Sequence, residues 1–294
     1  MALFTDEDIL RLDQTYAQEN VPFHARPLAA AFDILGDQFI LDLMQNPAVE
    51  EINLAYTRLV PEVEASWPGA GVGLIASIDQ VRKVVLGLTY GHASRSLDQL
   101  LGFKSHDQWA QWCRGDINIA ARSCYSFADI SDFITGINYM QGAGHGAPLK
   151  LWTLAAANLE EISNSLSTSI NVASATQPLC LVAELAMKGT LYHLGLSEKE
   201  IRTLGHHHKN IALRLAKECP HRDDNFIADI VNHIPDYVIT RYNGSSLTRL
   251  ETVQLALNVQ FIAASSLRRI SGVDHASDFE TREGFPGSRA EFFK

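Results

Sequence analysis

The C-terminal half of the chain contains the stretch Val182-Ala-Glu-Leu-Ala-Met-Lys-Gly-Thr-Leu-Tyr-His-Leu-Gly195. Its apolar residues cover most of the circumference of a helix. Glu184 and Lys188 form an i,i+4 pair in the favourable order on the one polar strip that remains. Gly195 then ends the helix. The stretch therefore predicts a mostly buried helix at the centre of a helical bundle.

Helical periodicity continues on both sides of this stretch. A long helix is expected before it, because apolar residues fall on one stripe: Leu151, Leu154, Ala155, Leu159, Ile162, Leu166 and Ile170. Two shorter helices are expected after it, over residues 208–219 and 225–240. A final helix over residues 248–270 ends at Gly272 and has an apolar seam formed by Leu250, Val253, Leu257 and Phe261.

The first half of the chain is also predicted to be helical. Thr5 is a candidate N-cap for a helix that ends near Asn20, and Arg26-Pro27 and Asn46-Pro47 open two more. Further helices are expected over residues 77–90, 105–114, where Ser105 and Gln108 form a capping box, and 127–140. Because no sustained alternation of apolar and polar residues is present, the fold class is predicted to be all-α.

A glycine-rich segment predicts the domain boundary. Gly142, Gly144, Gly146 and Pro148 interrupt every helical period, so residues 141–148 are the expected linker. This divides the chain into a helical N-terminal region over 1–140 and a helical bundle over 149–272. The polar, aperiodic segment 273–294 is expected to be a flexible tail.

The charge is unevenly distributed. Of the formal net charge of −10, residues before Pro148 carry 9 Lys+Arg against 18 Asp+Glu, and the remainder carries 15 against 16. A field of this sign repels phosphate backbones. The acidic N-terminal half therefore favours a basic protein partner.

Targeting signals are not evident in the sequence. Residues 1–8 lack a basic segment followed by an apolar one, and no window approaches the roughly 18 apolar residues of a membrane helix. A cytoplasmic protein without membrane contact is expected. The cysteines are predicted to be buried reduced thiols rather than metal ligands: Cys113, Cys124, Cys180 and Cys219.

Three segments over roughly residues 149–271 resemble HEPN domains. Residues 182–195 are similar to the second long helix of that family, and the connector Ser197-Glu-Lys-Glu-Ile-Arg-Thr-Leu-Gly-His206 looks like the family's Gly-His connector. Arg241-Tyr242 is similar to the pair that precedes the last HEPN helix. The resemblance implies a HEPN-like bundle that forms a homodimer. It also implies a role in a bacterial defence, toxin–antitoxin or nucleotidyltransferase-associated system, with a protein, a nucleotide or RNA as partner.

The residues that carry the resemblance are also the candidate ligand contacts, and no cofactor or metal is expected. They are Glu184, Lys188, His206, Arg241 and Tyr242. Many HEPN proteins are metal-independent ribonucleases that use an Arg and a His separated by four to six residues. The pairs Arg202–His207 and Arg214–His221 match that spacing but not its place in the family. A binding module without nuclease activity is the favoured prediction, a ribonuclease effector is the alternative, and an enzyme sited in the N-terminal helices is a third class.

Three further patterns have a structural and a functional interpretation. The run His206-His207-His208 is expected to be a helix start, because three consecutive side chains cannot share one metal without distortion. Gly69, Gly71 and Gly73 are expected to form an irregular turn rather than a phosphate loop. Asp129 and Asp132 are expected to pair with Arg114 or Arg122 in an internal ion-pair network, or else to line a ligand cleft.

Overall fold

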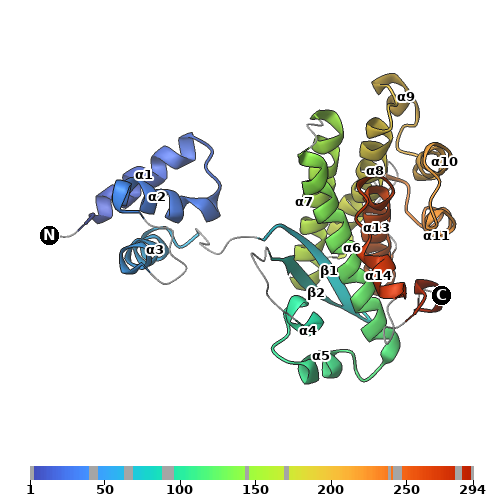
Figure 1. Ribbon diagram of the computed structural model, residues 1–294, viewed down its shortest axis with the longest axis horizontal. Helices are drawn as coiled ribbons and strands as arrows, with labels where there is room; N and C mark the ends of the chain where they lie inside the picture. The colour runs from blue at the N-terminus through green and yellow to red at the C-terminus, as the bar shows by residue number, and fades with distance from the viewer. Residues whose placement is uncertain are drawn as a thin grey trace. The chain divides into compact units, whose positions relative to one another are not determined.

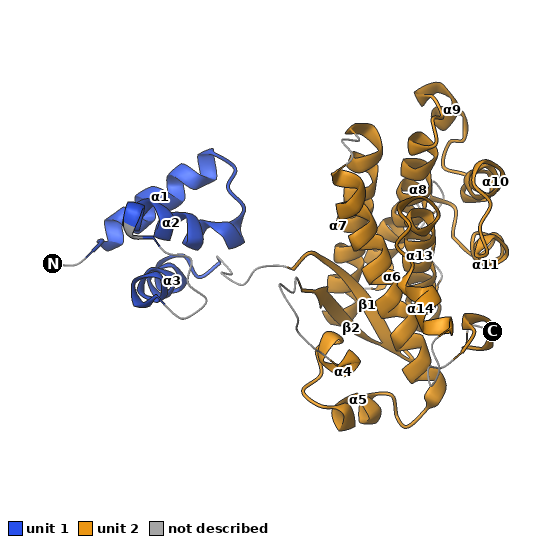
Figure 2. Ribbon diagram, in the orientation of Figure 1, with its two compact units in different colours: residues 1–68 blue, residues 69–294 orange. Residues whose placement is uncertain are grey.

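A computed structural model describes residues 3–39, 46–62, 69–87, 96–142, 146–168, 172–237, 240, 247–281 and 287–292 (Figure 1). The chain divides into two compact units, Met1–Pro68 and Gly69–Lys294 (Figure 2). The division therefore lies outside the predicted linker at 141–148. The reason is that helix α6 (Ile117–Gln141), on the N-terminal side of that linker, packs against helices of the C-terminal half.

The described residues of unit 1 form three α-helices. They are α1 (Asp6–Gln18), α2 (Arg26–Leu35) and α3 (Pro47–Leu59), with 3-10 turns η1 (Phe23–Ala25) and η2 (Gly36–Gln38). The predicted N-terminal signals are confirmed, because the Thr5 side chain accepts from the backbone N–H of Asp8 and Asn46 accepts from that of Ala48. A small core holds the unit together: Ile9, Tyr16, Ala30, Ala31, Leu35, Ile52, Ala55 and Tyr56.

Unit 2 is predominantly helical, which confirms the all-α class. Its core helices are α6, α7 (Gly146–Thr168), α8 (Thr176–His193) and α13 (Arg249–Ser271), and α13 contacts each of the others. The shorter helices, in chain order, are α4 (Leu97–Leu100), α5 (His106–Trp112), η3 (Val172–Ala175), α9 (Glu198–Thr203), α10 (His208–Glu218), α11 (Asp224–Ile230), α14 (His275–Thr281) and α15 (Arg289–Phe292). Among the described residues, no helix is both long and apolar enough to cross a bilayer.

A β-hairpin replaces the helix that was predicted over residues 77–90. Strands β1 (Gly71–Ser77) and β2 (Gln80–Leu86) pair antiparallel, with Gly71 opposite Leu86, and pack against α6 and α7 (Figure 1). Six of the seven residues of β1 are buried. A strand covered on both faces does not alternate between apolar and polar residues, so the pattern that identifies a strand is absent from its sequence.

The glycines of β1 have a packing role. A Cβ atom at Gly73 would clash with Cγ1 of Ile130, and one at Gly71 would clash with Cδ1 of Ile134, so glycine is needed for the strand to approach α6. The prediction of an irregular turn is wrong for these two positions. The close approach also admits the buried side chain of Gln260, whose Oε1 accepts from the backbone N–H of Leu74 at 2.9 Å.

The C-terminal segment packs onto unit 2 in its described part, so the prediction of a flexible tail over 273–294 is wrong there. The carboxylate of Asp132 accepts hydrogen bonds from the backbone N–H groups of His275, at 2.7 Å, and Ala276, at 3.3 Å, at the start of α14. Arg289 of α15 is buried. Both helices are shorter than two and a half turns, and such a short segment shows little periodicity in sequence.

Candidate functional site

A pocket of about 490 Å³ lies between α6, α11, α13 and α15 of unit 2. This volume falls within the range of small-molecule sites in proteins. Its apolar wall is formed by Phe226, Ile230, Leu257, Phe261 and Phe292. Its polar lining consists of Arg122, Asp229, His233, Gln254, Asn258 and Arg289.

Most of the polar lining is available to a ligand. The side chains of Arg122, Asp229, His233 and Gln254 are exposed and that of Asn258 is half-buried. Within the described part of the chain, none of these five side chains takes part in a hydrogen bond or an ion pair. A cation, a carboxylate, an imidazole and two amides therefore converge on one apolar pocket with their hydrogen-bonding capacity unused.

The aromatic wall is held in place by ring packing and by Arg289. The rings of Phe226 and Phe261 meet edge to face with centroids 6.3 Å apart. The guanidinium of Arg289 lies 4.7 Å from the centroid of Phe261 and 4.8 Å from that of Tyr125, a cation–π arrangement on both rings. Because Arg289 also binds Asp129 through both carboxylate oxygens, at 2.6 and 3.0 Å, its charge is neutralised inside the protein.

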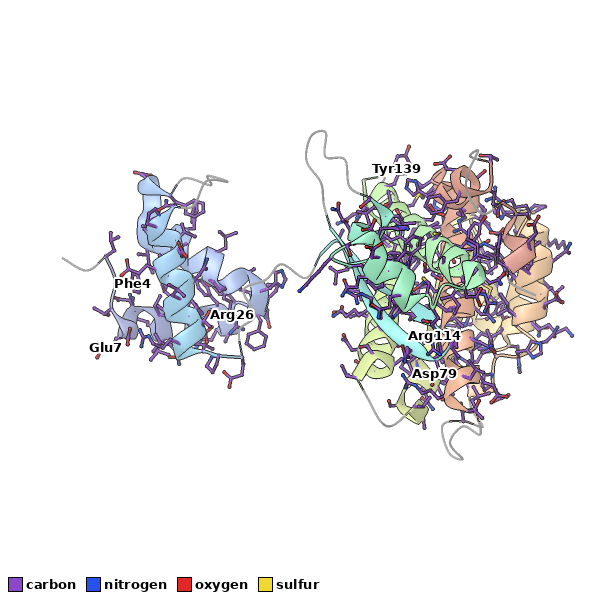
Figure 3. All side chains as sticks on the ribbon, turned by 90° about the horizontal axis from the view of Figure 1, so that it is seen from below. Phe4, Glu7, Arg26, Asp79, Arg114 and Tyr139 are labelled. Atoms are coloured by element: carbon purple, nitrogen blue, oxygen red, sulfur yellow. The ribbon has the colours of Figure 1, made fainter. Side chains whose placement is uncertain are left out.

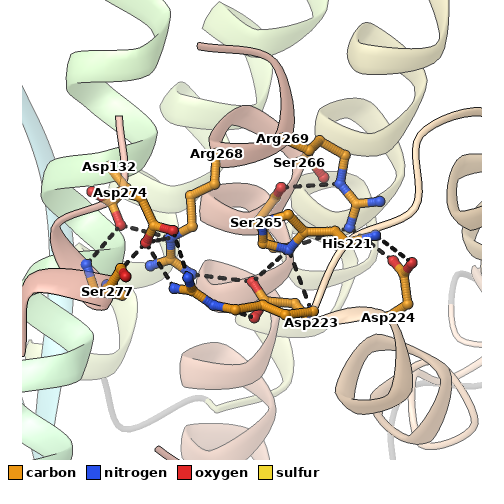
Figure 4. Close-up of polar contacts among 12 residues, drawn as sticks. Asp132, His221, Asp223, Asp224, Ser265, Ser266, Arg268, Arg269, Asp274 and Ser277 are labelled. Carbon is orange, nitrogen blue, oxygen red and sulfur yellow. Dashed lines mark hydrogen bonds and ion pairs between the residues drawn. The ribbon is translucent and has the colours of Figure 1, made fainter. Parts of the chain in front are cut away.

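A buried ion-pair network adjoins the pocket, because Arg289 lines the pocket and binds Asp129 of the network. Figure 4 shows the part of the network around Arg268, with Asp132 and Asp223. Arg268 of α13 is at its centre, with a side chain only 1% exposed, and its guanidinium binds Asp129, Asp132 at 2.6 Å and Asp223 at 3.5 Å. These contacts join α6, α13 and the residue before α11, and Arg289 extends them to α15. The network therefore fixes all four helices that form the pocket.

The charges of the network stabilise one another. Burial alone would lower the pKa of Arg268, but the carboxylates of Asp129, Asp132 and Asp223 raise it above its ordinary value, so the guanidinium stays charged. Burial raises the pKa of Asp132, an effect that Arg268 opposes. Burial would also raise the pKa of Asp223, but hydrogen bonding from His221 and the charge of Arg268 hold it well below the ordinary range.

Sequence reasoning found two members of this network and missed their partners. An internal ion-pair network at Asp129 and Asp132 is confirmed, but the cations are Arg268 and Arg289 rather than Arg114 or Arg122. One signal was available, since Arg268 lies seven residues after Phe261 and therefore falls on the predicted apolar seam of the last helix. A charged residue in that position indicates a buried partner.

Three of the candidate ligand contacts do meet in space. Lys188 donates to Glu184 at 2.7 Å and to the backbone carbonyl of Gly205 at 2.6 Å, and His206 Nδ1 lies 2.9 Å from Glu184. The His206 ring stacks on Tyr237 with centroids 5.1 Å apart. The cluster ties α8 to the connector before α10. The other two candidates, Arg241 and Tyr242, lie outside the described residues.

The three consecutive histidines have different environments. His206 contacts Glu184, and the exposed His207 occupies the N-cap position of α10. The buried His208 lies 2.9 Å from the backbone carbonyl of Cys180 through Nε2, which must carry the hydrogen because a carbonyl only accepts. Their side chains therefore do not converge on one point.

Both arginines of the two candidate nuclease pairs bind carboxylates. Arg202 binds Glu198 at 2.6 Å, and Arg214 binds Glu218 at 2.7 Å and Glu200 at 3.3 Å. His221 Nδ1 lies 3.4 Å from Asp223. In the described residues, no hydrogen bond joins the arginine to the histidine of either pair.

The buried His208 predicts a pH effect on stability. Burial lowers its pKa from the ordinary value of 6.5, so the unfolded chain binds a proton more readily than the folded one. The free energy of unfolding should therefore fall as the pH drops below about 6.5. His208→Gln keeps a donor near the Cys180 carbonyl and should reduce this fall, as measured by urea unfolding at neutral and acidic pH. An equal pH dependence in both proteins would contradict the assignment.

Comparison of the chain with models of protein families, with curated proteins and with solved structures gives no match. The HEPN resemblance accordingly stays a prediction from the sequence.

Proposed function

We propose that residues 69–294 form a HEPN-like binding module that holds a mononucleotide in the pocket between α6, α11, α13 and α15, and that the module has no nuclease activity of its own. The observation that carries the proposal is the set of unpaired polar side chains around an aromatic wall. The resemblance to HEPN proteins, whose non-catalytic versions bind partners or nucleotides, points the same way.

The pocket chemistry matches the parts of a nucleotide. Arg122 is exposed and offers a planar guanidinium to a phosphate group. The half-buried rings of Phe226 and Phe292 offer apolar surface to a base, and the buried Phe261 packs edge to face against Phe226. Asp229 accepts from an exocyclic amine, and the Asn258 amide both donates and accepts.

The buried network supports binding through preorganisation. Because Arg268 and Arg289 fix α6, α13 and α15, the aromatic wall is in place before a ligand arrives. Neither arginine offers a free charge to the ligand, since both are neutralised by Asp129 and its neighbours. Among the pocket arginines, only Arg122 should therefore contribute to binding of the phosphate group.

Calorimetric titration of the full chain with ribonucleoside 5′-monophosphates tests this proposal. We expect one of them to bind once per chain, and Arg122→Gln to weaken binding about tenfold or more, the effect of one lost charge-assisted hydrogen bond. Lys150→Gln is the matched control, because Lys150 is an exposed cation outside the pocket and should leave binding unchanged. The corresponding nucleoside should bind weakly and equally to the wild type and Arg122→Gln.

Two results would contradict the proposal. One is the absence of binding heat for every nucleotide at millimolar concentration. The other is equal affinity of the wild type and Arg122→Gln for the nucleotide that does bind. The alternative of a ribonuclease effector that uses Arg202 with His207 or Arg214 with His221 is tested separately by RNA cleavage.

Homodimerisation through the C-terminal half and a role in a bacterial defence, toxin–antitoxin or nucleotidyltransferase-associated system belong to the same proposal. Both are supported by the sequence resemblance over residues 149–271. Light scattering of the full chain at micromolar concentration tests the dimer, and a monomeric mass would contradict it.

A further inference from the structure

Unit 1 carries nearly all of the net charge of the chain. Its 68 residues contain 3 Lys+Arg and 12 Asp+Glu, a net charge of −9, whereas unit 2 contains 21 and 22. Each of its three cations is already paired within the unit: Arg11 with Asp8, Arg26 with Asp13 and Arg58 with Asp6. The remaining carboxylates have no cation in the unit to neutralise them. Figure 3 shows one of them, Glu7, at the outside of unit 1.

Unit 1 also exposes an unusual number of apolar side chains. Of 13 exposed large hydrophobic residues in the described part of the chain, 6 lie in its 68 residues: Leu3, Leu10, Phe23, Leu28, Phe32 and Leu54. Burying such side chains stabilises a complex, and clusters of them mark interaction surfaces.

The apolar side chains of α2 form a ridge. Leu28 and Phe32, 48% and 60% exposed, are four residues apart and therefore share one helix face. Phe39 extends the ridge, because its ring meets that of Phe32 edge to face at 5.5 Å. Asp33 and Asp37 are near it in sequence and are exposed, and the Asp33 carboxylate accepts from the Tyr16 hydroxyl at 2.5 Å. We call Leu28, Phe32 and Phe39 the α2 ridge.

We propose that the α2 ridge docks a basic amphipathic helix of a protein partner. Net charge distinguishes between the segments that could cover the α2 ridge. A second copy of unit 1 brings another net charge of −9 and is repelled, and unit 2, with a net charge of −1, supplies no basic field. A partner helix with leucines on one face and lysines along the borders of that face satisfies both the apolar ridge and the net negative charge of unit 1.

The test uses the full chain and three synthetic helical peptides of about 18 residues, a length that forms several helical turns. The first has leucine and lysine faces, the second replaces each leucine with serine, and the third replaces each lysine with glutamate. We expect the leucine–lysine peptide to bind in fluorescence anisotropy, with an affinity that falls between about 0.05 M and 0.3 M salt. The other two peptides should bind at least about tenfold more weakly.

Variants locate the binding surface. Leu28→Ser with Phe32→Ser should weaken binding of the leucine–lysine peptide about tenfold or more, which corresponds to the loss of at least one buried apolar contact. The matched control is Ile117→Ser with Leu213→Ser, which removes two apolar side chains that are 69% and 59% exposed on unit 2 and should change nothing.

Four outcomes would overturn the proposal. If the serine–lysine peptide binds as tightly as the leucine–lysine peptide, binding depends on charge alone and not on contact with the apolar ridge. An equal affinity in the wild type and the ridge variant, or no binding of the leucine–lysine peptide, would remove the ridge as its site. A dimeric mass in light scattering that the ridge variant converts to a monomeric one would assign the ridge to a second copy of the chain.

Discussion

Replacing Arg268 with methionine is expected to lower the free energy of unfolding by about 3–5 kcal/mol, the cost of leaving buried carboxylates without their cation. Four carboxylates lose a contact with Arg268: Asp129, Asp132, Asp223 and, at 3.7 Å, Asp274. Asp129 keeps Arg289, whereas Asp132 is left, among the described residues, with backbone donors alone. Methionine has a similar length but no charge or donor. The loss of stability therefore reports the missing ion pairs rather than a cavity left by a smaller side chain. Urea unfolding followed by circular dichroism gives the value.

The control for this substitution is Arg202→Met. Arg202 also pairs with a carboxylate, Glu198 at 2.6 Å, but its side chain is 79% exposed. Exposed ion pairs contribute at most about 1 kcal/mol, so this variant should unfold close to the wild type. If the two variants lose equal stability, the Arg268 network does not hold α6, α11 and α13 together.

Replacing Gln260 with leucine is expected to lower the free energy of unfolding by about 3 kcal/mol, because each buried polar group without a partner costs about 1–3 kcal/mol. The Gln260 amide bonds both backbone groups of Leu74, at 2.9 and 3.1 Å, and the carbonyl of Ser126 at 3.0 Å. It thus takes the place of a further strand beside β1. Leucine fills a similar volume but leaves these groups unsatisfied.

Gln254→Leu is the control on the same helix. Gln254 is exposed and has no hydrogen bond in the described residues, so its replacement should change stability by no more than about 0.5 kcal/mol. A Gln260→Leu variant that unfolds within about 1 kcal/mol of the wild type would show that the hairpin does not depend on this amide.

The helices were largely predictable because their signals are local. Thr248 caps the last helix through a capping box with Glu251, and Gly272 ends it in the left-handed conformation with φ of 73°. Ser197 and Glu200 cap α9 in the same way. Such signals need only neighbours three or four residues away.

The features that define the pocket depend on residues far apart in sequence. Asp129 binds Arg289 across 160 positions, and Gln260 binds Leu74 across 186. No periodicity in a single sequence identifies such pairs. The hairpin was missed for a related reason, since burial of β1 against α6 removes its alternation. The domain boundary was missed because α6, which lies before the glycine-rich segment, packs against α13, which is far away in sequence.

The sequence contains only a weak signal of the binding site. Gln254 and Asn258 are four residues apart on α13 and form a polar strip beside the seam residues Leu257 and Phe261. Such a strip normally faces solvent, so nothing in the sequence distinguishes a pocket wall from an exposed helix face. The distinction appears only when α11 and α15 are placed around it.

The most direct test of a binding module without nuclease activity is incubation of the purified full chain with end-labelled RNA in EDTA. We expect the RNA to remain intact with the wild type, His207→Ala and His221→Ala alike, because Arg202, Arg214 and His221 are bound to carboxylates and His207 is an exposed N-cap. A metal-independent ribonuclease added to a parallel sample verifies that the RNA can be cleaved in that buffer. RNA cleavage that either substitution lowers by about a hundredfold or more, the effect of losing a general acid or base, would contradict the proposal and identify a ribonuclease.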